Sequence, residues 1–141
     1  MLSVNVHTLP LQTKWGESNP TVRRVDVTFP FFGGIGTHNS AVVYFELEPG
    51  CVLGTHTDSA EEILLVLEGT VEATLGHEQG QLASGGIVLV PEMAPHNVTN
   101  VGSVTAKLVG FFAKANVVST FEEAFQPSGM RVFDTAQIPV A

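Results

Sequence analysis

Short apolar runs separated by glycine and proline recur along most of this chain. Several of them alternate polar and apolar residues with a period of two and carry many β-branched side chains, which is typical of half-buried strands. The predicted strands are residues 21–29 (TVRRVDVTF), 39–48 (NSAVVYFELE), two strands within 63–76 (ILLVLEGTVEATLG), 87–90 (IVLV), 96–101 (HNVTNV) and 105–112 (TAKLVGFF). Many short strands with glycine turns between them predict an all-β domain, either a barrel or a sandwich.

The two ends of the chain depart from this pattern. Residues 1–20 are interpreted as a lead-in arm, residues 21–112 as the barrel, and residues 113–141 as a C-terminal extension. Within the extension, Ser119 is placed to cap a short helical turn formed by the residues that follow it, TFEEAF. The tail from Met130 onward is expected to lie extended over the surface. All three segments are assigned to one domain, the usual organisation for a chain of 141 residues.

The composition is unusually apolar for a chain with no long apolar run. Apolar residues make up 44% of the sequence, yet no uninterrupted run approaches the roughly 18 residues of a membrane span, so no membrane association is expected. A small β-domain with surplus apolar surface more often hides it between subunits. The composition therefore predicts a homodimer.

Charge and cysteine content limit the partners and the compartment. Fourteen acidic residues against six basic ones give a net charge of −8, which repels phosphate backbones and argues against nucleic-acid binding. The single cysteine, Cys51, excludes an internal disulfide and agrees with a reducing compartment. The N-terminus lacks a basic start followed by a long apolar stretch, so no secretory signal is visible. A cytoplasmic location is expected.

A group of histidines and carboxylates falls within the predicted strands. In an extended strand His56, Asp58 and Glu62 share one face, whereas Glu61 points to the other. His96 lies on a separate strand, and strand parity alone does not bring it near them. Two imidazoles and up to two carboxylates, with no thiolate, suit divalent Fe, Mn, Ni, Co or Zn. Buried without a cation, the carboxylates would each cost several kcal/mol of desolvation.

The first of these segments resembles the first motif of the cupin superfamily, G-x5-H-x-H-x3,4-E-x6-G. Gly50, His56, Asp58, Glu62 and Gly69 match its spacing at every position. The one departure is Asp58, because the family usually has its second histidine there. The resemblance implies a double-stranded β-helix, or jelly roll, that closes around one divalent metal ion.

The second segment resembles the second cupin motif, G-x5-P-x-G-x2-H-x3-N. Gly85, Pro91, Met93, His96 and Asn100 fall on its positions, with Met93 in place of a glycine. The two motifs together imply that His56, Asp58, Glu62 and His96 are the metal ligands. Asn100 is interpreted as a structural residue that satisfies backbone groups at a strand end.

Each candidate also has a purely structural interpretation. A lone histidine at a strand end is more often hydrogen-bonded than metal-bound. Asp58 is suited to cap a turn over residues 57–60, and Glu61 and Glu62 are suited to form a solvated pair. The joint spacing of two separate motifs favours the metal site over these alternatives.

Three functions fit the predicted site. The first is a metal-dependent enzyme, such as a dioxygenase or an isomerase, that acts on a small organic molecule and uses Glu62 as ligand or general base. The second is a non-catalytic module that binds or senses a metal or small ligand. The third is a 2-oxoglutarate-dependent oxygenase in which Lys107 meets the co-substrate. Phe111 and Phe112 indicate an interior that is partly apolar.

Overall fold

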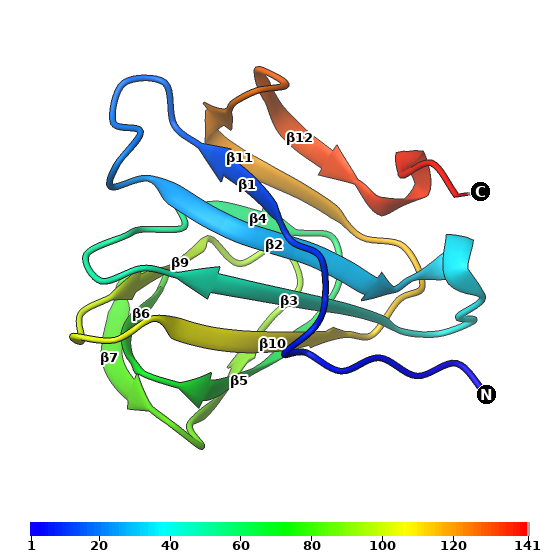
Figure 1. The fold of residues 1–141 in the computed structure, drawn as a ribbon, viewed down its shortest axis with the longest axis horizontal. Helices are drawn as coiled ribbons and strands as arrows, with labels where there is room; N and C mark the ends of the chain where they lie inside the picture. The colour runs from blue at the N-terminus through cyan, green and yellow to red at the C-terminus, as the bar shows by residue number, and fades with distance from the viewer. Residues whose placement is uncertain (141) are drawn as a thin grey trace.

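Two antiparallel sheets of six strands each make up most of the structure, a computed structural model that describes residues 1–140 (Figure 1). Sheet A consists, in spatial order, of β1 (Gln12–Trp15), β2 (Arg24–Phe31), β3 (Ala41–Leu47), β10 (Ala106–Phe112), β5 (Glu62–Glu68) and β8 (Ile87–Val90). Sheet B consists of β12 (Met130–Asp134), β11 (Val118–Phe125), β4 (His56–Asp58), β9 (His96–Asn100), β6 (Thr70–Leu75) and β7 (Glu78–Ala83).

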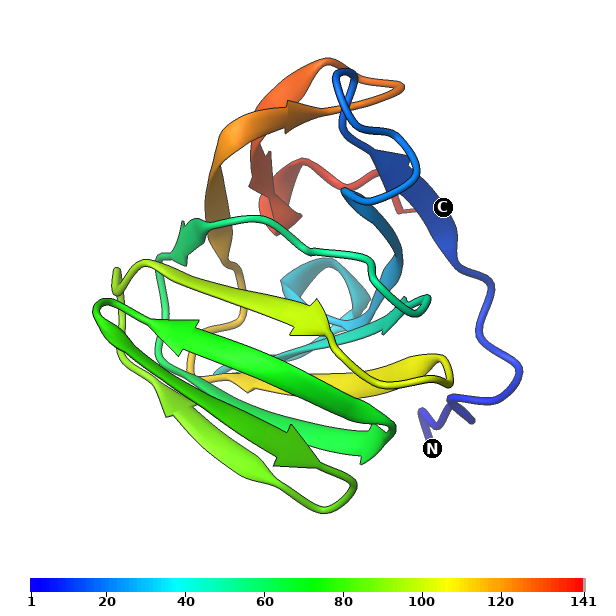
Figure 2. The ribbon, with the colours of Figure 1, turned by 90° about the vertical axis from the view of Figure 1, so that its left-hand side faces the viewer.

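Successive strands alternate between the two sheets for much of the chain. From β3 to β11 the path crosses from one sheet to the other at almost every connection, and only the hairpin β6–β7 stays within one sheet. The strands consequently wrap around a common interior (Figure 2). This arrangement confirms the predicted all-β jelly roll.

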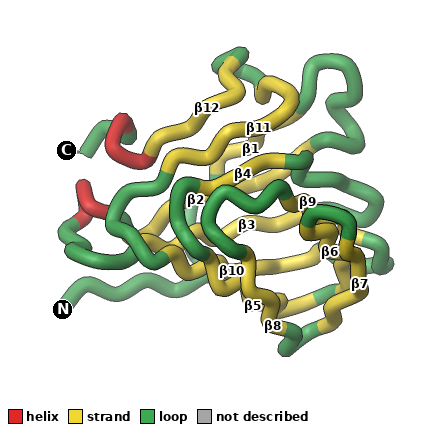
Figure 3. The backbone as a smooth tube through the Cα atoms, turned by 180° about the vertical axis from the view of Figure 1, so that it is seen from behind, coloured by secondary structure: helices red, strands yellow, loops and turns green. Residues whose placement is uncertain are grey.

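In the described part of the chain, helical structure is limited to two short 3-10 turns, η1 (Gly33–Ile35) and η2 (Thr135–Gln137). Both lie near the chain termini, at one end of the structure (Figure 3). Within residues 1–140, no helix has the length and apolar character needed to cross a membrane.

The interior is built by strand parity, as the sequence predicts. On β5 the side chains of Glu62, Leu64 and Val66 are buried, whereas Ile63 between them is exposed. The same alternation on β3 and β10 directs Phe45 and Leu108 into one apolar core between the sheets. Parity therefore places Glu62 at one end of an otherwise apolar row.

The C-terminal segment differs from the sequence prediction. The residues expected to form a helical turn after Ser119 form strand β11 instead, which pairs with β4 in the register Ser119↔Asp58 and Phe121↔His56. The helical prediction was wrong because pairing with β4 buries Ser119 and Phe121, which a lone helical turn on the surface would not do. The tail that follows contributes β12, which pairs with β11.

A patch of apolar side chains lies on the outer face of sheet A. Phe111, Ile63 and Leu89 are cross-strand neighbours on β10, β5 and β8, and Ile87 lies two residues from Leu89. These four side chains, hereafter the outer patch, are 46%, 40%, 51% and 63% exposed, respectively. Part of the apolar surplus in the sequence is thus exposed on the outer face of sheet A, where it extends onto the edge strand β8.

Asn100 has the structural role that the sequence predicts. Its side-chain amide donates to the carbonyls of Leu47 (2.8 Å) and Val104 (2.9 Å), and its Oδ1 accepts from the amide of Gly102 (2.9 Å). The side chain is fully buried, so no water replaces these bonds without rearrangement. Asn100 therefore ties the end of β9 to the end of β3.

Replacing Asn100 with alanine should destabilise the protein substantially. The change leaves two carbonyls and one amide without partners in a buried place, and we expect the free energy of unfolding to fall by roughly 3 kcal/mol. Urea unfolding followed by fluorescence measures this loss. Asn39→Ala, at an exposed position, serves as the control and should change the unfolding free energy little. Equal stability of the two variants would show that the Asn100 bonds contribute nothing net.

Candidate metal centre

Three strands carry the four side chains that the sequence singles out. His56 and Asp58 lie on β4, Glu62 begins β5, and His96 begins β9. The backbones of His56 and His96 pair directly across β4 and β9, so closure of the fold brings the distant histidine beside the others. All four side chains are nearly inaccessible, with 3–6% of their surface exposed. Glu61 is exposed, as parity predicts.

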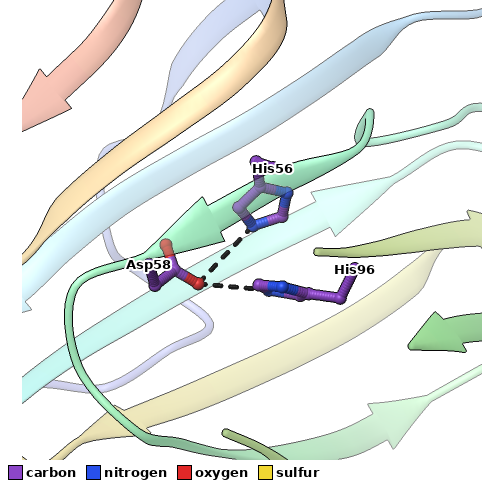
Figure 4. A group of neighbouring side chains, drawn as sticks. All are labelled: His56, Asp58 and His96. Carbon is purple, nitrogen blue, oxygen red and sulfur yellow. Dashed lines mark ion pairs between the residues drawn. The ribbon is translucent and has the colours of Figure 1, made fainter. Parts of the chain in front are cut away.

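The polar atoms of three of these side chains, His56, Asp58 and His96, point toward one another (Figure 4). Oδ2 of Asp58 lies 3.1 Å from Nε2 of His96 and 3.6 Å from Nε2 of His56. Ligand atoms of these three residues all lie within 4.8 Å of one another. Glu62 approaches from the side of His96, with 3.7 Å between Oε1 and Nε2. Three residues therefore form the centre, and the fourth borders it.

The hydrogen bonds of the two imidazoles fix which nitrogen faces the centre. Nδ1 of His56 lies 2.8 Å from the carbonyl of Gly54, and Nδ1 of His96 lies 2.8 Å from the carbonyl of Ala94. Because a carbonyl only accepts, each Nδ1 carries a proton and each neutral ring turns the lone pair of Nε2 inward. Outer hydrogen bonds of this kind orient histidine ligands in metal sites.

Two buried atoms of the centre are left without hydrogen bonds. Ser119 donates to Oδ1 of Asp58 at 2.5 Å, which leaves Oδ2 free to face the histidines. Among the described residues, neither Oδ2 of Asp58 nor Nε2 of His96 has a hydrogen-bond partner that meets the usual geometry, although the two atoms lie 3.1 Å apart. Buried polar atoms rarely remain unsatisfied. A cation between them would satisfy both, so the residues present fit a metal ion.

Burial and mutual charge shift the pKa values of all four groups. Burial, reinforced by His96, lowers the pKa of His56 to about 4, which keeps this imidazole neutral. Burial and the Asp58 charge raise the pKa of Glu62 to about 8. For Asp58 and His96, burial is outweighed by their interaction with each other, so the pKa of Asp58 is lowered and that of His96 is raised. A divalent cation bound here would displace protons from this set.

Two backbone features outside the strand pattern support the centre. A Cβ at Gly110 on β10 would overlap Oε2 of Glu62, so glycine provides the space that this carboxylate occupies. Glycine inside a strand often marks such a close approach, and this signal was available in the sequence. Met93 has φ 63°, the left-handed conformation that the glycine of the cupin motif would adopt easily, and its amide donates to the carbonyl of Asp58.

The centre forms part of the lining of a cavity of about 720 Å³. Most of the other lining residues are apolar, and the ring of Phe121 stacks on His56 with 4.4 Å between centroids. Phe112 lines the cavity, whereas Phe111 is exposed, so only one of the two predicted interior phenylalanines lies inside. Lys107 is not among the lining residues and instead forms an ion pair with Glu68 at 3.6 Å.

Sequence reasoning missed the residues that both chain ends contribute. Ser119 and Phe121 lie in the segment interpreted as a helical turn, and Lys14 lies in the lead-in arm, yet all three line the cavity. Phe121 and Phe125 are spaced as on a helix, so the sequence carried no period-two signal for β11. The four residues of β1 are too few for any periodic pattern.

Comparison with known proteins connects this geometry to a family. The model of the cupin domain matches residues 43–112, which contain both motifs. The uncharacterized protein MJ1618 of Methanocaldococcus jannaschii is 33% identical over 51 residues, which cover 36% of this chain and 41% of that protein. The matched segment thus spans less than half of this relative.

Solved structures share the fold at low sequence identity. A putative sugar phosphate isomerase from Acidithiobacillus ferrooxidans has a TM-score of 0.65 and 22% identity, covering 99% of this chain and 96% of that one. A recombinant oxalate oxidase in complex with glycolate has a TM-score of 0.65 and 21% identity, covering 69% of this chain and 54% of that one. With both motifs inside the matched domain and a jelly-roll structure around them, the chain belongs to the cupin superfamily.

Proposed function

We propose that this cupin binds one divalent transition metal ion, Fe, Mn, Ni or Zn, and is an enzyme that acts on a small organic molecule. His56, Asp58 and His96 hold the ion, with Glu62 beside them as a fourth ligand or as a base. The observation that carries this proposal is the convergence of two imidazole Nε2 atoms and one carboxylate oxygen, two of the three unpartnered, at the wall of a cavity.

The donor set suits a hard or borderline cation. With Asp58 and Glu62 both ionised, the two carboxylates balance the charge of a dication, which favours Mn or Fe over Cu. When bound, such an ion acts as a Lewis acid toward an oxygen atom of the substrate. Asp58 is held by Ser119, so its orientation does not depend on the ion.

Glu62 is the residue proposed to move a proton. In the metal-free protein, burial and the Asp58 charge raise its pKa to about 8. A dication bound beside it would lower that pKa and leave the carboxylate form that a general base needs. Its Oε1 faces the centre at 3.7 Å from Nε2 of His96, and its carboxyl group lines the cavity. A substrate bound in the cavity would therefore contact Glu62 directly.

The cavity favours an enzyme over the alternatives. A module that senses only its metal needs no space beside it, whereas here about 720 Å³ of mostly apolar cavity reaches the centre. The oxalate oxidase and the putative sugar phosphate isomerase of similar fold support a dioxygenase-like or isomerase-like reaction on a small molecule. The 2-oxoglutarate interpretation loses its cationic residue, because Lys107 lies outside the cavity.

Removing either histidine should abolish most metal binding. His56→Ala and His96→Ala each delete an inward-facing Nε2, and we expect metal affinity to fall at least about tenfold. Elemental analysis of protein purified without a nickel resin, followed by titration of metal into the metal-free variants, measures this loss. His77→Ala, at an exposed position outside both motifs, is the matched control. Full occupancy in either site variant would remove that histidine from the ligand set.

The same titration distinguishes the roles of Asp58. Asp58→His restores the usual family residue and should retain metal, whereas Asp58→Ala should weaken binding at least about tenfold. Ser119→Ala keeps the carboxylate but removes its hydrogen bond, so its effect should be smaller than that of Asp58→Ala. Unchanged affinity in Asp58→Ala would show that Asp58 only shapes the turn after β4.

The free energy of unfolding of the metal-free protein should depend on pH because Glu62 is buried. Its pKa rises from 4.5 to about 8 on folding, so between these values the unfolded chain loses a proton that the folded protein keeps. Unfolding therefore becomes easier as pH rises, and Glu62→Gln escapes this effect. Urea unfolding with a chelator present should show wild type losing stability relative to Glu62→Gln between about pH 5 and pH 8. A constant difference across this range would mean that Glu62 is ionised when folded.

The outer patch supports the expected homodimer. A two-fold axis brings the same patch of both subunits together, and apolar residues facing apolar residues are self-complementary. The four members carry no charge, and charge depletion with aromatic enrichment marks the core of an interface. A chain with a net charge of −8 would otherwise repel its own copies.

Light scattering at micromolar concentration tests the dimer. Wild type should have about twice the 15.0 kDa mass of the chain, and the double variant Ile63→Lys/Leu89→Lys should be a monomer. Val104→Lys changes an equally exposed apolar residue outside the outer patch and should remain dimeric. A monomeric wild type contradicts the proposal, and a dimeric double variant places the interface elsewhere.

A further inference from the structure

Lys14 is the only lysine or arginine among the described residues that line the cavity. It lies on β1 opposite Val25, a buried residue of β2 that also lines the cavity. Thr13, its neighbour on the strand, turns the other way and bonds to Asp26. Strand parity therefore directs Lys14 inward, toward the space that the metal centre also borders.

The ammonium group of Lys14 has no anionic partner within residues 1–140. It makes no ion pair and donates no hydrogen bond there, and its one specific contact is with the ring of Phe133, 4.0 Å from the centroid. Asp134 also lines the cavity, but its carboxylate accepts from the amide of Ala136. Burial lowers the pKa of Lys14, as expected for a cation in a half-buried place. A surface lysine usually extends into solvent or pairs with an acidic residue, and Lys14 does neither fully.

A continuous row of aromatic rings connects Lys14 to the metal centre. His56 stacks on Phe121, Phe121 meets Phe133 edge to face at 5.9 Å, and Phe133 lies under Lys14. Phe125 completes the group at 4.9 Å from Phe121. These three phenylalanines form an apolar wall between Lys14 and the metal centre.

With a dication bound, the metal centre at one end of this wall is close to neutral, whereas Lys14 at the other end is positively charged. Asp58 and Glu62 neutralise a bound dication, so Lys14 supplies the remaining positive charge of the cavity. An amine in such a place attracts an anion, and the wall favours an apolar or aromatic body. Neither preference depends on which metal is present.

We propose that Lys14 is the specificity-determining residue of the cavity and that the ligand is a small organic anion with an apolar body. The anionic group pairs with Lys14, the body packs against Phe121 and Phe133, and the opposite end faces the centre. This inference rests on the proposed function, because it names the substrate class for the same cavity. The competing explanation is that Lys14 only anchors β12 through Phe133.

Titration calorimetry with a matched pair of probes tests the proposal. The probes are 4-phenylbutyrate and its uncharged amide, 4-phenylbutanamide, added to metal-loaded protein. Wild type should bind the carboxylate about tenfold more tightly than the amide, the factor expected for a hydrogen bond to a charged group. Lys14→Met, which keeps length without charge, should bind both probes equally. Lys14→Arg should retain the preference.

Controls separate this inference from the proposed function. Lys107→Met removes a lysine from outside the cavity and should bind both probes as wild type does. Elemental analysis should find unchanged metal in Lys14→Met, so a loss of carboxylate preference cannot come from a lost ion. A wild type that holds no metal refutes the proposed function. The same two probes are then titrated into the metal-free protein, where a carboxylate preference that is lost in Lys14→Met still reports on Lys14.

Three results would overturn the inference. They are equal binding of the two probes by wild type, no binding of either probe, and a carboxylate preference that survives in Lys14→Met. In the third case the anion binds at the metal centre instead. Thermal unfolding distinguishes the anchoring role: if Lys14 only holds Phe133, Lys14→Met lowers the melting temperature and leaves the probe preference intact.

Discussion

The burial of two carboxylates and two imidazoles around one point is the constraint on which the rest of this structure depends. Removing such groups from water carries a large desolvation penalty, and it is tolerable only where each atom has a defined partner. The fold supplies most partners from the backbone, through Gly54 and Ala94, and one from Ser119. The atoms that remain unpartnered all face the centre. The proposed metal binding would therefore be coupled to stability at this place, since the arrangement is unfavourable without an ion.

Neighbouring elements are shaped to accommodate that group. Gly110 leaves room for Glu62, and the left-handed Met93 ties its loop to the backbone of Asp58. Asn100 fixes the far end of β9, the strand that His96 begins. These features lie on three different segments, so the centre results from the closed fold and not from either motif alone.

The sequence predicts the fold well, and strand parity and motif spacing also predict which side chains the fold brings together. Parity separates Glu62 from Glu61, and the structure places His96 of the second motif beside Asp58 and Glu62. The prediction fails at β11, where Phe121 and Phe125 are spaced as on a helix and pairing with β4 decides the outcome. The sequence does not predict that Lys14 faces the cavity, because β1 has only four residues and its inward face is defined only by its pairing with β2.

The matched cupin domain ends at residue 112, but β1, β11 and β12 lie outside it. These three strands contribute Lys14, Ser119, Phe121 and Phe133 to the cavity. The motifs thus supply the residues proposed to hold a metal ion, whereas the two ends of the chain supply much of the remaining cavity lining. New ligand preference can consequently arise by changing the chain ends while the motifs stay the same. Transferring the arm and the tail between cupins is then a route to exchanging what they recognise.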